Sequence, residues 1–529
     1  MRTMSERHLQ LVMPDELSIE VLVSRLHQSM RFSESGPVTL KRTYYDSFDW
    51  RLYAHGGVLE AESGNGAIDL LWRALDSGEL YNRQPVDTLP RFAWDLPCGP
   101  LRKALEPVLE MRVLLPVAWV RSTVRTLHVL NKDEKTVARV LVEENVPLAP
   151  GGMATGRHLP RVRVLPVKGY PKYLQQLRQL LESDLGLPPA NEDLMLVALG
   201  ALGRQPADYS SKINVPLDPA MRAHTATKTI LRHLLQTLKA NEAGVRADLD
   251  SECLHDFRVA VRRTRSALAQ IRDVFPAEAL ERFRPAFAWL GDITGPTRDF
   301  DVYLLNFDQY KRSLPAAFRD HLDPLRGFLH AHQKKAHLAL VAQLDSPRYR
   351  EVIADWRAFL QDPADAPAGL RNAGRPALVV AGEQIWRVYG HALKQGRAIG
   401  AQTPAEALHE LRKTCKKLRY LMEFFRSLYP AAEIHRLVKA LKTLQDNLGE
   451  IQDLQVQMRS LRQISRQMAD EVAVDTLMAM GMLVDVLATR QRRARAAFRK
   501  RFAKFAAAEN RDLFKALFAQ SPAQQASRS

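Results

Sequence analysis

The sequence predicts an α+β N-terminal domain built on an antiparallel sheet, followed by a longer all-α domain. Three observations predict this. Up to about residue 205, short runs rich in β-branched and aromatic residues alternate with clusters of Gly, Pro, Asn and Asp. From Met221 onward, the period of amphipathic helices continues with few interruptions. Within this helical part, one stretch of sequence occurs twice.

The N-terminal domain is expected to span residues 1–205 and to have a barrel-like sheet. Its strand-like runs are HLQLVM, VTLKRTYYD, AIDLLWRAL, RVLLPVAWVRSTVRTLHVL, TVARVLVEENV and RVRVLPV. The segment PKYLQQLRQLLESDLGL instead has a helical period and ends at Gly186, a typical helix C-cap. A linker is expected over 206–219, because Gly, Pro, Ser and Asp interrupt both periodicities there.

The helical domain is expected to span residues 220–508, with a tail over 509–529. A joint rich in Pro, Ala and Gly divides it into halves at about 220–362 and 375–508. Helices are predicted over 221–243, 253–275, 277–293, 298–311, 315–344, 347–361, 375–399, 405–428, 431–448, 451–470 and 471–507.

The two copies of the repeated stretch are 154 residues apart. HDFRVAVRRTRSALAQIRDVFP occupies 255–276, and HELRKTCKKLRYLMEFFRSLYP occupies 409–430. The register continues in the pairs Asp292 and Asp446, Gly295 and Gly449, and Asp299 and Asp453. A match of this length without an insertion indicates two copies of one structural unit.

Each copy places cations on one helical face, opposite an apolar face. The polar arc of the first copy holds His255, Arg258, Arg262 and Arg265. That of the second holds His409, Arg412, Lys416 and Arg419. Three cations widen these faces: Arg263, Lys413 and Lys417. Each stripe extends over roughly 15 Å, enough to contact several groups of an extended polyanion.

A helix with one charged face is most often an ordinary surface helix. Solvated faces usually mix signs and form i,i+4 acid–base pairs, whereas these arcs hold cations almost alone. Mutual repulsion within such a row favours a bound anion. The histidines are compatible with capping and packing as well as with ligand contact. Asp299 and Asp453 could act as general bases, but we expect each to pair with an arginine and fix its orientation.

The paired His-x-x-Arg-x-x-x-(Arg/Lys)-(Arg/Lys)-x-Arg helices, each followed by a Gly-containing segment that ends in Asp, resemble the conserved histidine α-helical domain, CHAD. The resemblance covers roughly residues 210–510. It implies two pseudo-symmetric four-helix halves whose basic helices line a central cavity that binds inorganic polyphosphate. The implied polyphosphate contacts are His255, Arg258, Arg262, Arg263, Arg265, His409, Arg412, Lys413, Lys416, Lys417 and Arg419.

The segment TYYDSFDWRLYAHGGVLEAE resembles the strand-turn-strand of CYTH domains, the triphosphate tunnel enzymes. Catalysis in that family requires an N-terminal Glu-x-Glu-x-Lys that holds a divalent metal. This chain has His8, Gln10 and Val12 at those positions, which do not supply the carboxylate oxygens that Mg²⁺ or Mn²⁺ prefers.

Two further places reverse the charge of the CYTH pattern. Glu60 and Glu62 stand where basic residues would bind triphosphate, and Arg161 and Arg163 stand where an acidic strand would complete the metal site. Three other arginines are interpreted as charges on the sheet surface: Arg112, Arg121 and Arg125. We therefore expect a degenerate, non-catalytic CYTH-like domain with no catalytic residue, metal site or cofactor.

The distribution of basic and acidic residues along the chain predicts that an anionic partner binds the helical domain. Residues 1–205 hold 25 Lys and Arg against 24 Asp and Glu, whereas the rest of the chain holds 51 against 35. The cysteines Cys98, Cys253 and Cys415 lack metal-type spacing and suit a reducing compartment. Without a signal peptide or an apolar run long enough to cross a bilayer, the expected location is the cytoplasm, with no membrane partner.

The leading hypothesis is a cytoplasmic protein that binds inorganic polyphosphate, at polyphosphate granules, through its basic helices. One alternative is an inorganic triphosphatase that uses the N-terminal domain. A second is a nucleic-acid-binding protein, although single-strand binders interleave aromatic residues with the cations and the two arcs contain none. The sequence does not indicate an oligomeric state.

Overall fold

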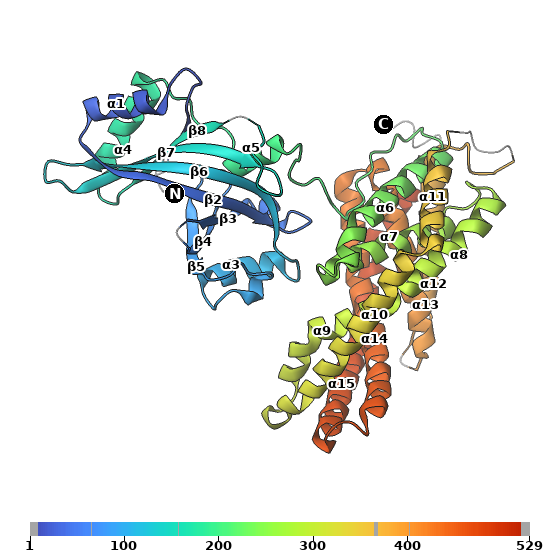
Figure 1. Ribbon diagram of the computed structural model, residues 1–529. Coiled ribbons are helices and arrows are strands. Elements are labelled where there is room, and N and C mark those ends of the chain that lie inside the picture. The colour runs from blue at the N-terminus through green and yellow to red at the C-terminus, as the bar shows by residue number, and fades with distance from the viewer. Residues whose placement is uncertain (1–8, 65, 157, 364–368, 401, 520–529) are drawn as a thin grey trace. The chain divides into compact units, whose positions relative to one another are not determined.

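The computed structural model describes residues 9–64, 66–156, 158–363, 369–400 and 402–519. They belong to two compact units, Met1–Ser210 and Ser211–Ser529, each of which is considered by itself (Figure 1). The change from one unit to the other falls inside the segment interpreted as a linker. Its last part packs with the helices, because the alternating side chains of Ile213, Val215 and Leu217 are buried in their core.

The N-terminal unit contains an eight-stranded antiparallel sheet with the order β1-β8-β7-β6-β2-β3-β4-β5, as the fold-class prediction expected. The strands are β1 (Leu9–Val12), β2 (Phe32–Asp46), β3 (Gly57–Ser63), β4 (Ile68–Ala74), β5 (Leu80–Val86), β6 (Leu115–Leu130), β7 (Thr136–Leu148) and β8 (Leu159–Pro166). The sheet curls so that its edges approach each other: a Cβ atom on Gly78, between β4 and β5, would lie 2.3 Å from the Gln10 side chain of β1.

Short helices cover parts of this sheet through separate apolar clusters. They are α1 (Ile19–Ser29), α2 (Arg51–Ala54), the 3-10 turn Ala93–Asp95, α3 (Pro100–Leu109), α4 (Pro171–Arg178), the π-helical turn Gln179–Asp184 and α5 (Leu194–Ala201). Helices α1 and α4 pack against β6–β8 through Leu22, Leu26 and Leu177. Helix α3 packs against β3 and β4 through Leu101 and Leu105.

The second unit is all helical. Its helices are α6 (Ala223–Arg246), α7 (Ser251–Gln270), α8 (Ala277–Ile293), α9 (Gly295–Ser313), α10 (Asp323–Leu344), α11 (Pro347–Gln361), α12 (Ala377–Arg397), α13 (Ala405–Phe424), α14 (Ala431–Met468), α15 (Val474–Phe505) and α16 (Ala508–Phe518), with 3-10 turns at Ala316–Phe318, Asp320–Leu322 and Arg426–Leu428. No helix in the described ranges combines the length and apolarity needed to cross a bilayer.

The duplication is exact for the starts of the first three helices of each half. Helices α12, α13 and α14 each begin 154 residues after α6, α7 and α8. The halves also meet through reciprocal hydrogen bonds: the Ala223 N–H donates to the Arg375 carbonyl at 2.8 Å, and the Ala377 N–H donates to the Met221 carbonyl at 2.7 Å. Both pairs obey the same offset, so the halves are related by a pseudo-twofold axis. In the described ranges the first half has six helices, α6 to α11, and the second has five, α12 to α16, against the four expected per half.

One predicted boundary differs from the structure, and the absence of a proline explains it. The helices predicted over 431–448 and 451–470 are one continuous helix, α14. Its counterpart is divided into α8 and α9, where Pro296 lacks the N–H that a continuous helix needs. The second copy has Glu450 at the matching position, so nothing interrupts α14.

The tail predicted over 509–529 also differs from the structure. Helix α16 occupies most of its first half, and Phe514 stacks on Tyr389 of α12 with ring centroids 3.8 Å apart. Residues 520–529 lie outside the described part of the chain.

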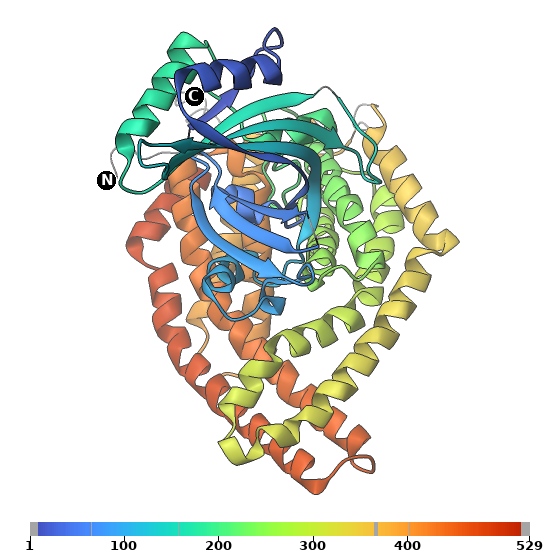
Figure 2. The ribbon, with the colours of Figure 1, turned by 60° about the vertical axis from the view of Figure 1, so that its left-hand side comes forward.

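The helical unit has two apolar cores. The main core is formed by both halves and includes Phe257, Ile385 and Leu418. A second core lies in an arm where α9 and the start of α10 pack against the second half of α14 and the first half of α15 (Figures 1 and 2). The arm extends α14 and α15 well beyond the main core.

Candidate anion-binding surface

Helices α7 and α13 present their cations because their apolar faces are buried. On α7, Phe257, Val261 and Leu268 are at most 2% exposed, and on α13 Leu411 and Leu418 are fully buried. The N-terminus of α7 is capped by Asp250, whose side chain accepts hydrogen bonds from the N–H groups of residues 252 and 253. The predicted division into apolar and basic faces is therefore confirmed, and each helix has a fixed rotation that exposes its basic row.

The α7 row is defined as Arg258, Arg262 and Arg265. It contacts the end of α8 and the turn between α8 and α9. The Arg258 guanidinium donates to the Gly291 carbonyl at 3.1 Å and to the Thr294 hydroxyl at 2.8 Å. A Cβ atom on Gly291 would lie 2.7 Å from Arg265 Nη1, so the glycine leaves room for this second guanidinium.

The α13 row, defined as Arg412, Lys416 and Arg419, is held by acids at its two ends. Arg412 donates to the Asp453 carboxylate of α14 at 3.1 Å, which confirms the predicted pairing of this aspartate with an arginine. Arg419 lies 3.3 Å from the Glu423 carboxylate, one helical turn onward. Lys416, which lies between these two arginines, forms no ion pair with any residue that the structure describes.

The two rows converge on each other. Burial, together with repulsion from Arg262 of α7 and Arg412 of α13, lowers the pKa of the Lys416 ammonium to about 7. Burial also lowers the pKa of Arg258, which Asp299 partly offsets, while Arg262 adds repulsion. Because Arg262 acts on residues of both helices, the α7 row and the α13 row form one cluster of positive charge.

The histidines lie at the outer ends of the rows. His255 Nδ1 is 3.1 Å from the Arg298 guanidinium, which also donates to the Ser251 carbonyl at 2.9 Å. His409 is half-buried, and its Nδ1 atom has no hydrogen-bond partner among the described residues. The two histidines therefore have different surroundings despite their matched positions.

Three of the cations predicted as contacts lie apart from the converging rows. Arg263 donates to the Glu423 carboxylate and to the Ser211 carbonyl, both at 2.9 Å, and so connects α7 to α13. Lys413 pairs with Glu410 on the exposed side of α13 at 2.5 Å. Lys417 is exposed and, among the described residues, forms no ion pair.

Two residues that shape this surface were missed by the sequence analysis. Arg298 adds a cation beside His255 and Asp299. Its place directly before Asp299 in the sequence could have pointed to it. The second copy has Gln452 at the matching position, so comparison of the copies did not reveal a basic residue. Glu423 binds both Arg263 and Arg419: its i,i+4 spacing from Arg419 was a usable signal, whereas no local pattern indicated the contact with Arg263 of α7.

In the N-terminal unit, the interior of the curled sheet holds a self-neutralising ion network. Arg42 of β2 contacts Glu143 of β7 through both terminal nitrogens at 3.0 Å, and also contacts Glu60 and Glu62 of β3 at 3.1 and 3.0 Å. Burial works against ionisation of Glu143, but Arg163 and Arg42 outweigh it and hold the pKa of its carboxyl at about 2.

The positions that were compared with the CYTH pattern lie on this network or beside it. Glu60 also pairs with Arg73 at 3.2 Å, and Arg163 lies 2.6 Å from Glu143. Burial lowers the pKa of Arg161. In β1, the Gln10 and Val12 side chains carry no carboxylate, and His8 lies outside the described residues. Within the described ranges, no group of three or more His, Cys, Asp or Glu is arranged to hold a metal ion.

The interpretation of three arginines as sheet-surface charges needs one correction. Arg112 is 1% exposed and lies 3.1 Å from Asp49, because it sits between α3 and β6 rather than on the outer face of the sheet. Arg125 is half-buried and lies 3.4 Å from Glu34, and Arg121 is exposed.

Comparison with known proteins shows which domain the helical unit resembles. Residues 229–462 match the model of the CHAD domain. The chain is 28% identical over 310 residues to Uncharacterized protein Rv2226 of Mycobacterium tuberculosis, an alignment that covers 57% of this chain and 55% of that protein. The chain therefore spans about half the length of the curated relatives it matches.

Two solved structures are similar to parts of the chain. The CHAD domain of Ricinus communis is 27% identical, with a TM-score of 0.47, and the match covers 56% of this chain and 96% of that one. HpAC1 of Hippeastrum, described as showing a dominant triphosphatase activity, is 11% identical with a TM-score of 0.26, covering 38% and 99%. Residues 229–462, which contain both repeated basic helices, are therefore similar to the CHAD domain.

Proposed function

We propose that the protein binds inorganic polyphosphate along the converging α7 and α13 rows and associates with polyphosphate granules through this surface. The convergence of the two rows carries the proposal. A linear chain of phosphates presents repeated negative charges that could interact with Arg258, Arg262 and Arg265 on one side and with Arg412, Lys416 and Arg419 on the other.

The chemistry of the rows supports a phosphate polymer. Arginine offers forked hydrogen bonds to phosphate oxygens, and Arg258 and Arg412 are already oriented by their neighbours. Arg262 and Lys416 form no ion pair with a described residue, so a bound phosphate would supply the missing counter-charge. Lys416 is half-buried beside the exposed Arg262, and holding these like charges together without an anion is unfavourable, a cost that is relieved on binding.

The test uses the double variant Arg262→Ala, Lys416→Ala, which removes one unpaired cation from each row. We expect the affinity for long-chain polyphosphate to fall by at least about tenfold, and the slope of log affinity against log salt to become shallower by roughly 1–2. The matched control is Arg462→Ala, Arg466→Ala, which removes two exposed cations of α14. Equal losses in both variants would mean that binding depends on overall charge alone.

Competition with RNA separates this proposal from binding of any polyanion. At equal phosphate concentration, we expect polyphosphate to displace RNA from the full chain. RNA that displaced polyphosphate instead would favour the nucleic-acid alternative. A fluorescent fusion should concentrate on granules only in cells that make polyphosphate, and the Arg262→Ala, Lys416→Ala variant should remain diffuse.

A further inference from the structure

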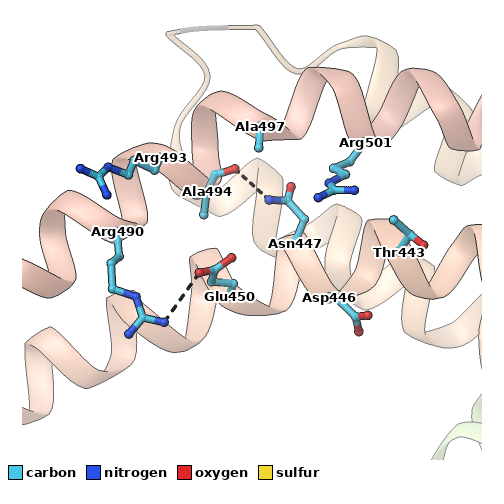
Figure 3. Close-up of a pocket in the computed structure, with 9 residues that line it drawn as sticks. All are labelled: Thr443, Asp446, Asn447, Glu450, Arg490, Arg493, Ala494, Ala497 and Arg501. Atoms are coloured by element: carbon cyan, nitrogen blue, oxygen red, sulfur yellow. Dashed lines mark hydrogen bonds and ion pairs between the residues drawn. The ribbon is translucent and has the colours of Figure 1, made fainter. Parts of the chain in front are cut away.

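A polar cavity lies between α14 and α15, apart from the two rows of cations. It has a volume of about 450 Å³ and is walled by Asn447, Glu450 and Asp446 of α14 and by Arg490, Arg493 and Arg501 of α15 (Figure 3). The cavity exists because α15 presents only the small side chains of residues 494 and 497 where it faces α14. Its size is within the range of sites that bind small metabolites.

The α15 wall supplies cations without assigned partners. Arg493 and Arg501 are exposed and form no hydrogen bond or ion pair with any residue in the described ranges. Arg490 reaches Glu450 only at 3.9 Å. The phenylalanines Phe498, Phe502 and Phe505 on the same helix are buried in the main core, so they fix the rotation that turns these arginines outward. This wall is suited to an anionic group such as a phosphate.

The α14 wall supplies hydrogen-bond acceptors. Asn447 is 8% exposed, and its amide N–H donates to the Ala494 carbonyl at 2.8 Å (Figure 3). Since a carbonyl only accepts, this bond fixes the orientation of the amide and leaves Asn447 Oδ1, which has no partner in the described structure, as an acceptor. Asp446 and Glu450 add carboxylate oxygens beside it.

This acceptor wall distinguishes the cavity from the polyphosphate surface. Polyphosphate offers almost no donors at neutral pH, so it leaves Asn447 Oδ1 unsatisfied, and its charge is repelled by Asp446 and Glu450. Asp446, Glu450 and Asp453 recur at i, i+4 and i+7, and therefore form an acidic stripe on α14. One end of the stripe pairs with Arg412 of the α13 row, and Glu450 faces Arg490 of α15.

We propose that the α14–α15 cavity binds a phosphorylated sugar, with the phosphate on one of the arginines that line its α15 wall and the sugar hydroxyls donating to Asn447 Oδ1, Asp446 and Glu450. A sugar phosphate combines the two kinds of group that the two walls require. No aromatic side chain among the described residues lines the cavity to stack a base, so a sugar phosphate fits it better than a nucleotide does. The proposal is independent of polyphosphate binding.

Calorimetric titration of the full chain with ribose 5-phosphate and with glucose 6-phosphate tests the proposal. We expect at least one of them to bind roughly tenfold or more tightly than inorganic phosphate or the free sugar, because both walls are then engaged. The variant Arg493→Ala, Arg501→Ala should lose roughly tenfold or more of this affinity. Ala497→Trp, which fills the cavity, should abolish binding.

The matched control is Arg492→Ala, Arg499→Ala, which removes two exposed arginines of α15 that do not line the cavity. This control should bind the sugar phosphate as the unchanged protein does. The proposal is overturned if neither sugar phosphate binds, if inorganic phosphate binds equally well, or if the control variant loses as much affinity. It is also overturned if Arg493→Ala, Arg501→Ala loses polyphosphate binding in parallel, since the two ligands would then share one site.

Discussion

The lowered pKa of Lys416 predicts that polyphosphate binding is coupled to proton uptake. The ordinary pKa of a lysine is 10.5, and burial together with Arg262, Arg412 and Arg419 lowers that of Lys416 to about 7, while Asp453 of α14 acts in the opposite direction. Above pH 7 the unbound side chain is therefore mostly neutral. A bound phosphate favours the charged ammonium and raises the pKa again, so binding must take up a proton.

The size of the effect follows from the two protonation states. At pH 8 a group with a pKa near 7 is about one tenth protonated, so binding should take up about 0.9 proton. The affinity should fall by nearly tenfold between pH 8 and pH 9, as long as the pKa in the complex lies well above 9. Histidines, which ordinarily titrate near pH 6.5, contribute little in this window.

In the absence of polyphosphate, pH has the opposite effect on the stability of the fold: affinity falls as the pH rises, whereas stability increases. The folded-state pKa of Lys416 is lower than its unfolded value, so the unfolded chain binds more protons between about pH 7 and 10.5. The contribution of this residue to the free energy of unfolding therefore increases with pH across that window. Saturating polyphosphate should remove this dependence.

Calorimetry in buffers of different ionisation enthalpy measures the proton uptake directly. Lys416→Arg, which stays charged at all these pH values, should bind without proton uptake and with an affinity that is flat between pH 8 and 9. Lys417→Arg, at the exposed neighbour, should behave like the unchanged protein. The reasoning is refuted if the unchanged protein binds polyphosphate at pH 8 with no proton uptake, or if Lys416→Arg retains the uptake.

Three substitutions test other parts of the structure. Glu423→Gln should lower the free energy of unfolding by about 1–2 kcal/mol in urea titrations, because two arginines lose their carboxylate, and should raise polyphosphate affinity by freeing Arg419. Gly396→Val should cost about 1–3 kcal/mol by thermal unfolding, since a Cβ atom there would lie 1.9 Å from the Phe502 ring. Arg42→Met should cost about 3–5 kcal/mol in the same measurement, because it removes the cation that three clustered carboxylates share and leaves two of them with a single arginine each.

Each of these substitutions has a matched control in the chain. Glu410→Gln removes an exposed acid of α13, Gly390→Val adds a side chain to α12 where no atom lies within 4 Å, and Arg121→Met removes an exposed arginine of the sheet. All three should change the free energy of unfolding by less than about 1 kcal/mol. A control as damaging as its partner would contradict the corresponding contact.

The periodicity of the sequence predicted the helices and the basic faces because both depend on residues three or four positions apart. Phe257 and Leu418 are buried, and Arg262 and Lys416 lie on the opposite faces of their helices, as the arcs required. The continuity of α14 could also have been predicted, because Pro296 has no proline counterpart in the second copy.

The sequence did not reveal which cations converge, because this depends on partners far away in the chain. Arg263 resembles the neighbouring arginines of the α7 row in sequence, but its guanidinium binds Glu423, which is 160 positions away. In the N-terminal unit, Arg42 and Glu143 are 101 positions apart and meet only when the sheet curls. The sequence showed that individual charges are reversed relative to the CYTH pattern. It did not show that the reversed residues form ion pairs with other residues of the sheet.

The central claim is that the α7 row and the α13 row form one polyphosphate site. A structure of the full chain with a linear polyphosphate of defined length tests it most directly. We predict phosphate oxygens within hydrogen-bonding distance of Arg262 on α7 and Lys416 on α13 in the same complex. A polymer that contacts only one of these helices, or that lies along α15 instead, would contradict the account.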